Sequence, residues 1–216
     1  GVWGTSSSDV FAVGYNGTIL HHDGTVWSEM TSGTTVDLRD VWGTSSNDVF
    51  AVGYNGTIVH YDGTAWSEMA TGTDRPLSGV WGASSTDVYA VGLYGTILHY
   101  DGTSWSMKMS GTWESLYAVW GTSSSDVFAA SGSTIRHYDG VEWTGMASGR
   151  GLADVWGTSS SDVYAVGDRG AIRHYDGTEW SEMVSGTDQP LHGVWGSSSS
   201  DVFSVGYWGV ILRGTR

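Results

Sequence analysis

The chain has 216 residues, of which 33 are glycine, 13 are tryptophan and none is cysteine, and its formal net charge at pH 7 is −14. The lack of cysteine excludes disulfides and thiolate metal sites. With Lys108 as its single lysine, the acidic chain is a poor match for nucleic acid or an anionic membrane surface, because binding to phosphate requires protein cations. No long apolar run of roughly 18 residues is present, so no membrane span is predicted.

A Val-Trp-Gly motif recurs along the chain at intervals of 39, 39, 39, 36 and 39 residues. The repeats begin near Trp3, Trp42, Trp81, Trp120, Trp156 and Trp195. A fixed period near 40 predicts one supersecondary unit per repeat, which buries its apolar faces by stacking on its neighbours. We therefore expect residues 1–216 to form a single domain.

The second repeat shows the first two expected strands. Residues 38–43 are predicted to form the first strand, and a polar Thr-Ser-Ser-Asn-Asp loop follows it. Residues 48–53 form the second. Both alternating sets of this strand are apolar, which predicts a strand that is covered on both faces.

The second half of the repeat contains two tight turns. Asn55-Gly56 supplies the two positive-φ positions of a type I′ hairpin turn, after which residues 57–61 form the third strand. Asp62-Gly63 makes the next turn, into a fourth strand at residues 65–69. This last strand is the most polar, as expected of an outer edge.

Four antiparallel strands in each of six repeats predict an all-β, six-bladed β-propeller, with five or seven blades as alternatives. The sixth repeat ends after its third strand, so the last blade is expected to be incomplete in this chain. The missing strand is expected from residues upstream of Gly1, or it is absent. Because the chain begins in mid-motif, we expect it to be a piece of a larger polypeptide.

Most repeated residues have a structural interpretation. Eleven of the 13 tryptophans occupy repeated positions and are predicted to be core. The third strands of five repeats share one histidine position, occupied by His21, His60, His99, His137 and His174, with Arg213 in the sixth. Because each histidine belongs to a different repeat, a hydrogen bond within its own blade is favoured over a metal or acid–base array. The repeated Asp-Gly pairs are interpreted as turns rather than calcium sites.

The string Trp-Gly-x-Ser-Ser-x-Asp-Val-Phe/Tyr-Ala-Val-Gly, followed by Gly-Thr-Ile-Leu-His-Tyr-Asp-Gly-x-x-Trp, resembles tandem propeller repeats of secreted and surface bacterial proteins. These are similar in style to BNR/Asp-box and WD-type propellers, although the Asp-box turn sequence and the WD dipeptide are both absent. The resemblance covers the whole chain and implies an extracellular or cell-surface location. It also implies a lectin, adhesion or assembly module and, less often, a glycosidase or lyase.

The repeats differ most in the turn between the second and third strands and in the loop that enters the next repeat. The resemblance places these two segments together on one rim, where propellers commonly bind ligands. The candidate ligand-binding residues are Tyr15, Asn16, Arg39, Tyr54, Asn55, Arg75, Tyr94, Trp113, Glu114, Arg150, Asp168, Arg169, His192, Tyr207 and Trp208. Aromatic rings beside Asp, Asn and Arg suit a sugar, whereas the alternative is that they are ordinary surface residues.

The favoured function is thus a non-catalytic binding module that recognises glycans through several weak rim sites. A protein–protein interaction scaffold is the alternative, and a glycan-active hydrolase or lyase is the second. No catalytic residue is assigned. Asp40 and Asp154 precede their repeated tryptophans by two residues and are candidates for an axial cation such as calcium, with solvated channel carboxylates as the other interpretation.

Overall fold

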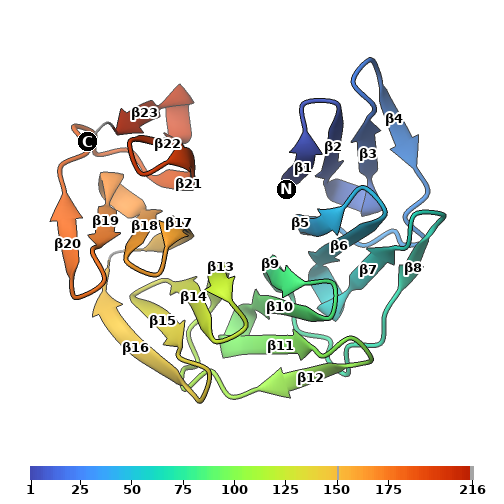
Figure 1. Ribbon diagram of the computed structural model, residues 1–216, viewed down its shortest axis with the longest axis horizontal. Helices are drawn as coiled ribbons and strands as arrows, with labels where there is room; N and C mark the ends of the chain where they lie inside the picture. The colour runs from blue at the N-terminus through green and yellow to red at the C-terminus, as the bar shows by residue number, and fades with distance from the viewer. Residues whose placement is uncertain (150, 215–216) are drawn as a thin grey trace. The chain divides into compact units, whose positions relative to one another are not determined.

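The computed structural model describes residues 1–149 and 151–214, with the backbone alone at 147 and 148 (Figure 1). The chain is an all-β, six-bladed β-propeller, in which five blades have four antiparallel strands and the last has three. It divides into two compact units, Gly1–Lys108 and Met109–Arg216, each of which contains three blades. None of the helical segments in the described ranges is long and apolar enough to cross a bilayer.

The first unit contains blades 1 to 3, and in each of them the strands lie side by side in sequence order. The strands of blade 1 are β1 (Val2–Ser6), β2 (Asp9–Val13), β3 (Ile19–His22) and β4 (Trp27–Met30). Those of blade 2 are β5 (Leu38–Ser45), β6 (Asp48–Gly53), β7 (Ile58–Tyr61) and β8 (Trp66–Glu68). Those of blade 3 are β9 (Leu77–Ser84), β10 (Asp87–Gly92), β11 (Thr96–Tyr100) and β12 (Trp105–Lys108).

The second unit contains blades 4 to 6 in the same order. The strands of blade 4 are β13 (Leu116–Ser123), β14 (Asp126–Ser131), β15 (Thr134–Tyr138) and β16 (Trp143–Ser148). Those of blade 5 are β17 (Leu152–Ser159), β18 (Asp162–Gly167), β19 (Ile172–Tyr175) and β20 (Trp180–Met183). Those of blade 6 are β21 (Leu191–Ser198), β22 (Asp201–Gly206) and β23 (Ile211–Gly214).

All four strands predicted for blade 2 are present, and their bounds differ from the prediction by at most two residues. Strand β6 has the predicted bounds and is buried along almost its whole length. Strand β5 runs two residues beyond its predicted end, because Ser45 pairs with Asp48 past a bulge that follows Gly43. The predicted polar loop therefore shrinks to residues 46 and 47. Strands β7 and β8 are shorter than predicted by one and two residues respectively.

A short 3-10 turn joins the second and third strands in five blades. These turns are η1 (Tyr15–Gly17), η2 (Tyr54–Gly56), η3 (Leu93–Gly95), η4 (Asp168–Gly170) and η5 (Tyr207–Gly209). In η2, Asn55 and Gly56 have φ values of 56° and 67°, and the Thr57 N–H donates to the Tyr54 carbonyl at 2.9 Å. This geometry confirms the predicted type I′ turn. A Cβ on Gly56 would lie 2.1 Å from the Thr73 carbonyl oxygen, so glycine is required there.

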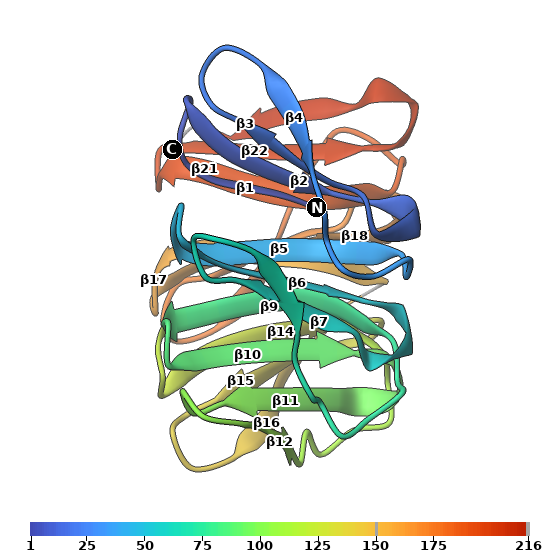
Figure 2. The ribbon, with the colours of Figure 1, turned by 90° about the vertical axis from the view of Figure 1, so that its right-hand side faces the viewer.

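Neighbouring blades within a unit pack face to face. We call the face toward the next blade the leading face and the other the trailing face. In the first unit, Phe11, Val13 and Ile19 on the leading face of blade 1 pack against Val41, Val49, Ala51, Val59 and Trp66 on the trailing face of blade 2. Figure 2 shows β1, β5 and β9 of this unit lying side by side. The core of a unit is therefore a series of layers between blades.

Of the eleven repeated tryptophans that were predicted to be core, three are buried, six are half-buried and two are exposed. Trp66 and Trp105 are 7% and 8% exposed, which confirms them as core. Trp27 and Trp195 are 50% and 60% exposed, so the prediction that they are buried was wrong. Trp27 lies on the trailing face of blade 1 and Trp195 on the leading face of blade 6. The repeat pattern gives them a core position, but burial also requires a neighbouring blade.

Candidate functional site

The two variable segments of the repeat meet at one end of each blade, which we call the turn end. The N–H of the first turn residue donates to the carbonyl of the residue that precedes the first strand. This bond joins Tyr54 to Asp37 and Leu93 to Pro76 in the first unit, and Asp168 to Gly151 and Tyr207 to Pro190 in the second, at 3.0–3.1 Å. Backbone contacts thus hold the turn and the incoming loop together whatever their side chains are.

The middle residue of each turn has a left-handed backbone. Its φ is 53–59° in Asn16, Asn55, Tyr94, Arg169 and Trp208. This conformation is tolerated by asparagine but costs roughly 1–2 kcal/mol in bulky residues. Tyr94 and Trp208 are nevertheless 59% and 91% exposed, so their rings are held out into solvent at a conformational cost.

In the first unit, four of the predicted site residues come together as two pairs. The Arg39 guanidinium lies over the Tyr54 ring, 4.5 Å from its centroid, and also donates to the Tyr54 hydroxyl. The Arg75 guanidinium donates to the Tyr94 carbonyl at 3.5 Å. Tyr15 is 79% exposed.

The turn of blade 1 is held by the next loop through a side chain. The Asn16 N–H donates to the Asp37 carboxylate at 2.8 Å. Asn55, the counterpart of Asn16 in blade 2, is exposed. Both asparagines therefore have an evident role in forming the turn, and only their exposed amides are left for a ligand.

In the second unit, His192 and Tyr207 contact each other edge to face, with ring centroids 4.2 Å apart. This pair occupies the positions that Arg39 and Tyr54 hold in blade 2. Trp113, in the loop before β13, is 82% exposed, as expected for a residue outside the repeat pattern. The predicted site residue Arg150 lies outside the described residues.

Glu114 has a structural role in the shortened turn of blade 4. Its carboxylate accepts hydrogen bonds from the Ser131 and Ser133 hydroxyls and from the Ser133 N–H. The hydroxyl of Ser133, followed by that of Ser131, holds the pKa of Glu114 below its usual range. These hydrogen bonds give Glu114 a structural role in the turn between β14 and β15.

Two grooves occupy equivalent places in blades 1 and 5, between the turn, the outer strand and the incoming loop. The blade 5 groove has a volume of about 990 Å³ and the blade 1 groove about 710 Å³. The first is lined by Asp168, Arg169, Arg173, Glu182, Ser185 and Asp188 among others, and the second by Asn16, Glu29, Thr31, Ser32, Thr34 and Thr35. Sequence reasoning missed the outer-strand carboxylates Glu29 and Glu182, because they belong to the repeated Trp-Ser-Glu-Met string that was interpreted as scaffold.

The two candidate axial carboxylates bind the backbone of the following blade. Asp40 accepts the Val80 N–H at 2.9 Å, and Asp154 accepts the Val194 N–H at 2.8 Å. Burial raises the pKa of Asp40, although the N–H groups of Val80 and Val41 oppose this effect. Within the described residues, no three His, Asp or Glu side chains converge as a metal site. The axial cation stays a prediction.

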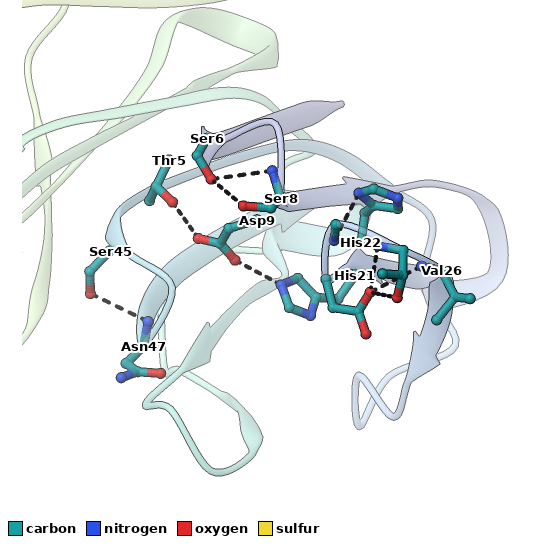
Figure 3. A network of polar contacts seen from close by, with 12 residues as sticks. Thr5, Ser6, Ser8, Asp9, His21, His22, Val26, Ser45 and Asn47 are labelled. Atoms are coloured by element: carbon teal, nitrogen blue, oxygen red, sulfur yellow. Dashed lines mark hydrogen bonds and ion pairs between the residues drawn. The ribbon is translucent and has the colours of Figure 1, made fainter.

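The opposite end of each blade, which we call the network end, repeats one hydrogen-bond chain. In blade 1 the Thr5 hydroxyl donates to Asp9, whose other carboxylate oxygen lies 2.7 Å from the His21 Nε2 (Figure 3). The same Asp–His distance is 2.7–2.8 Å in blades 2 to 5, and in blade 6 Arg213 donates to Asp201 at 2.8 Å. The structural interpretation of the repeated histidines is confirmed.

The sequence matches no model of a known protein family, and no match was found among curated proteins. Solved structures do match. YCF48 bound to D1 peptide is 15% identical over 100% of this chain and 91% of that chain, with a TM-score of 0.61. The C-terminal WD40 domain of Sif2 is 13% identical over 99% and 65%, with a TM-score of 0.73. A chain of the COPII outer coat vertex on membranes is 12% identical over 99% and 68%, with a TM-score of 0.78. At such identities the likeness is one of fold, a propeller of repeated blades.

Proposed function

We propose that this propeller is an interaction module that binds a protein or peptide partner at the turn ends of its blades. The observation that carries the proposal is the set of large aromatic side chains held out into solvent there, three on the turns and one on an incoming loop. These side chains are Tyr15, Tyr94, Trp113 and Trp208, with exposed fractions of 59–91%. Tryptophan, tyrosine and arginine are the residue types that contribute most to binding at protein interfaces.

The rigidity of the turns supports this proposal. A side chain on a fixed turn loses little conformational entropy when it binds, so more of the contact energy appears as affinity. The left-handed conformation of Tyr94 and Trp208 is a cost in the free protein, and it places both rings in solvent. One of the similar structures, YCF48, is a propeller bound to a peptide, which is consistent with this use of the fold.

Charge indicates the kind of partner. With a net charge of −14, the chain attracts a basic partner over distance and repels an acidic one. We therefore expect a segment that combines Lys or Arg with an aromatic or aliphatic anchor, and association that slows as ionic strength rises.

The test is selection from a random peptide library displayed on phage, followed by affinity measurements on the selected peptides. The expected result is a set of basic peptides whose binding falls at least about tenfold when Tyr94 and Trp208 are both changed to Ala. The matched control is Trp27→Ala, which removes an exposed tryptophan on an outer strand. Equal binding to the double variant and to the wild type would overturn the proposal.

Glycan recognition is the second candidate, and the paired grooves in blades 1 and 5 favour it. Multivalent lectins use similar sites in several repeats, and these two grooves share their position and their polar lining. Carboxylates Glu29 and Glu182 on the outer strands could accept sugar hydroxyls. The expected extracellular or cell-surface location would expose the chain to either class of ligand.

A glycan array, probed with and without calcium, separates the two candidates. Binding that is saturable and lost in the double variant Glu29→Gln, Glu182→Gln would establish the grooves as sugar sites. The matched control is Glu142→Gln, an exposed carboxylate outside both grooves. A blank array with peptide binding intact would leave the protein-binding function alone.

A further inference from the structure

The grooves of blades 1 and 5 share their place in the repeat but differ in their cations. Asn16 on the turn lines the blade 1 groove, and the equivalent residue in the blade 5 groove is Arg169. Arg173 on β19 also lines the blade 5 groove, at the position that Leu20 holds in β3. Among the described residues that line the blade 1 groove, none is cationic. Two guanidinium groups therefore distinguish the blade 5 groove.

Arg173 takes a position that is apolar in blades 1, 2, 3 and 6. Its counterparts Val59 and Leu98 are fully buried on the trailing faces of blades 2 and 3. The Arg173 side chain is 26% exposed, so its charge is largely removed from water. Blade 5 lies between blades 4 and 6 in the chain, and all three belong to the second unit. The sequence thus places a charge where the fold otherwise places a buried aliphatic side chain.

The Arg173 guanidinium is poorly paired. Its ion pair with Glu182, the residue opposite it on β20, has an Nη2–Oε2 distance of 3.8 Å. Arg136, at the same position in blade 4, donates to the Trp143 carbonyl at 2.8 Å, whereas Arg173 makes no hydrogen bond within the described part of the chain. A guanidinium has five N–H donors, and half-burying it without hydrogen-bond partners costs free energy. An anion in the groove would offset this cost.

Arg169 is the second cation of this groove. It is exposed in the middle of η4, where its φ is 56°, and it makes no ion pair within residues 1–149 and 151–214. Asparagine tolerates this left-handed conformation better than a long side chain does, and asparagine is the residue in blades 1 and 2. A conformational cost at Arg169 and a desolvation cost at Arg173 therefore fall in one groove. Such costs gather where a fold holds a ligand.

The carboxylates of the groove indicate the kind of anion. Asp168, Glu182 and Asp188 line it together with the two arginines. They repel a ligand with several negative charges, but they accept hydrogen bonds from hydroxyl groups. A ligand with one carboxylate and several hydroxyls satisfies both kinds of group, because a planar guanidinium binds a carboxylate through two parallel hydrogen bonds. The groove volume of about 990 Å³ is sufficient for a small-molecule ligand.

We propose that the blade 5 groove binds an acidic sugar of the uronic acid type, whose carboxylate contacts Arg173 and Arg169 and whose hydroxyls donate to Glu182. The inference rests on the second candidate function, glycan recognition by the grooves, and it specifies the ligand of one of them. It makes no use of the aromatic rings of Tyr94 and Trp208, on which the peptide proposal depends.

The test is an NMR titration that follows the backbone amide signals of the protein as methyl β-glucuronide is added. A salt concentration of about 0.15 M screens the repulsion from distant carboxylates. Methyl β-glucoside is the matched ligand, because it has the same ring without the carboxylate. Acetate supplies a carboxylate without hydroxyls, and inorganic phosphate supplies a different anion. The glucuronide is expected to bind at least about tenfold more tightly than each of the other three.

Arg173→Leu is the main variant, and it is expected to fold because leucine holds this position in blades 1, 3 and 6. Its affinity for the glucuronide is expected to fall at least about tenfold, with no change for the glucoside. Arg169→Asn introduces the residue of blades 1 and 2 and is expected to weaken glucuronide binding alone. Lys108→Gln, which removes one positive charge from an exposed side chain in the first unit, is the matched control and is expected to bind as the wild type does.

The outcomes separate this inference from the function on which it rests. Equal affinity for glucuronide and glucoside would overturn the acidic-sugar inference and leave glycan recognition standing, whereas no binding of either sugar would overturn both. Acetate or phosphate that binds as tightly as the glucuronide would overturn it in favour of a simple anion site. A loss in Lys108→Gln as large as that in Arg173→Leu would also overturn it, because the effect would then be one of overall charge.

Discussion

The two ends of a blade have the same backbone regularity but different side-chain regularity. At the network end, an Asp and a His or Arg recur in every blade with nearly constant geometry, and a Thr or Ser hydroxyl joins them in five of the six blades. At the turn end, the backbone hydrogen bonds recur, whereas the exposed residue on the turn is Asn, Tyr, Arg or Trp. Side-chain hydrogen bonds thus recur at the network end, whereas the bonds that recur at the turn end are those of the backbone. Under the proposed function, the varied and exposed side chains of the turn end contact the partner.

The largest expected effect is at the network end. Changing Asp48 to Ala removes the acceptor for both Thr44 and His60 and leaves a partly buried imidazole without its partner. We expect the free energy of unfolding to fall by about 2–3 kcal/mol, measured by urea denaturation. The control is Asn47→Ala at the adjacent exposed residue. A loss for Asp48→Ala no larger than that of the control would contradict the role given to this network.

A gain in stability is expected at the turn end. Changing Trp208 to Gly relieves a left-handed backbone in a residue that is 91% exposed, so the free energy of unfolding should rise by about 1 kcal/mol. Asn16→Gly at the matching position of blade 1 should change it by less, since Asn tolerates this conformation. Thermal unfolding measures both. A Trp208→Gly protein that is less stable than the wild type would show that the indole stabilises the fold.

A smaller loss is expected from the pair formed by Arg39 and Tyr54. Arg39→Ala removes the guanidinium that lies over the Tyr54 ring, and an exposed contact of this kind contributes about 0.5–1 kcal/mol. Arg39→Lys should recover part of the loss, because it keeps the charge without the planar stacking. A double-mutant cycle with Tyr54→Leu gives the coupling energy. Zero coupling would mean that the two side chains only lie near each other.

The smallest effect concerns pH at the network end. Hydrogen bonds from Thr64, Thr103 and Thr178 lower the pKa values of Asp62, Asp101 and Asp176 from 3.8 to about 2. Because the folded pKa values lie below the unfolded ones, the stabilisation is fully present above about pH 4 and is lost as the pH falls through about 2. The triple Asp→Asn variant should show a smaller drop in melting temperature over this range. These carboxylates are fully exposed, so the difference will be small. Equal acid sensitivity in both proteins would contradict the predicted loss of stability from these carboxylates at low pH.

Much of the fold is predictable from the repeat because local signals agree with tertiary contacts. The second strand of blade 2 was predicted at its observed bounds, since its doubly apolar pattern reports burial on two faces. The first strand was predicted too short. Thr44 and Ser45 have turn-like side chains, but pairing with β6 past the bulge keeps both in the strand.

The candidate site is only partly predictable. The differences between repeats identified the turn and the incoming loop, and the resemblance to propellers predicted that they meet. The stacking of Arg39 on Tyr54 depends on a register shift between Leu38 and Asp40 that no local pattern encodes. The exposure of Trp27 and Trp195 was missed for a related reason. Every repeat gives its tryptophans the same local sequence, and only their place in the series of blades decides whether a neighbour covers them.

The most direct test of the central claim is one affinity comparison with a peptide selected on the wild type. Isothermal titration calorimetry would measure its affinity for the wild type, for the Tyr94→Ala, Trp208→Ala protein and for the network-end variant Asn47→Ala. Binding at the turn ends predicts an affinity loss of about tenfold or more in the double variant and no change in the network-end variant. Equal affinity for all three proteins, or a loss confined to Asn47→Ala, would contradict it.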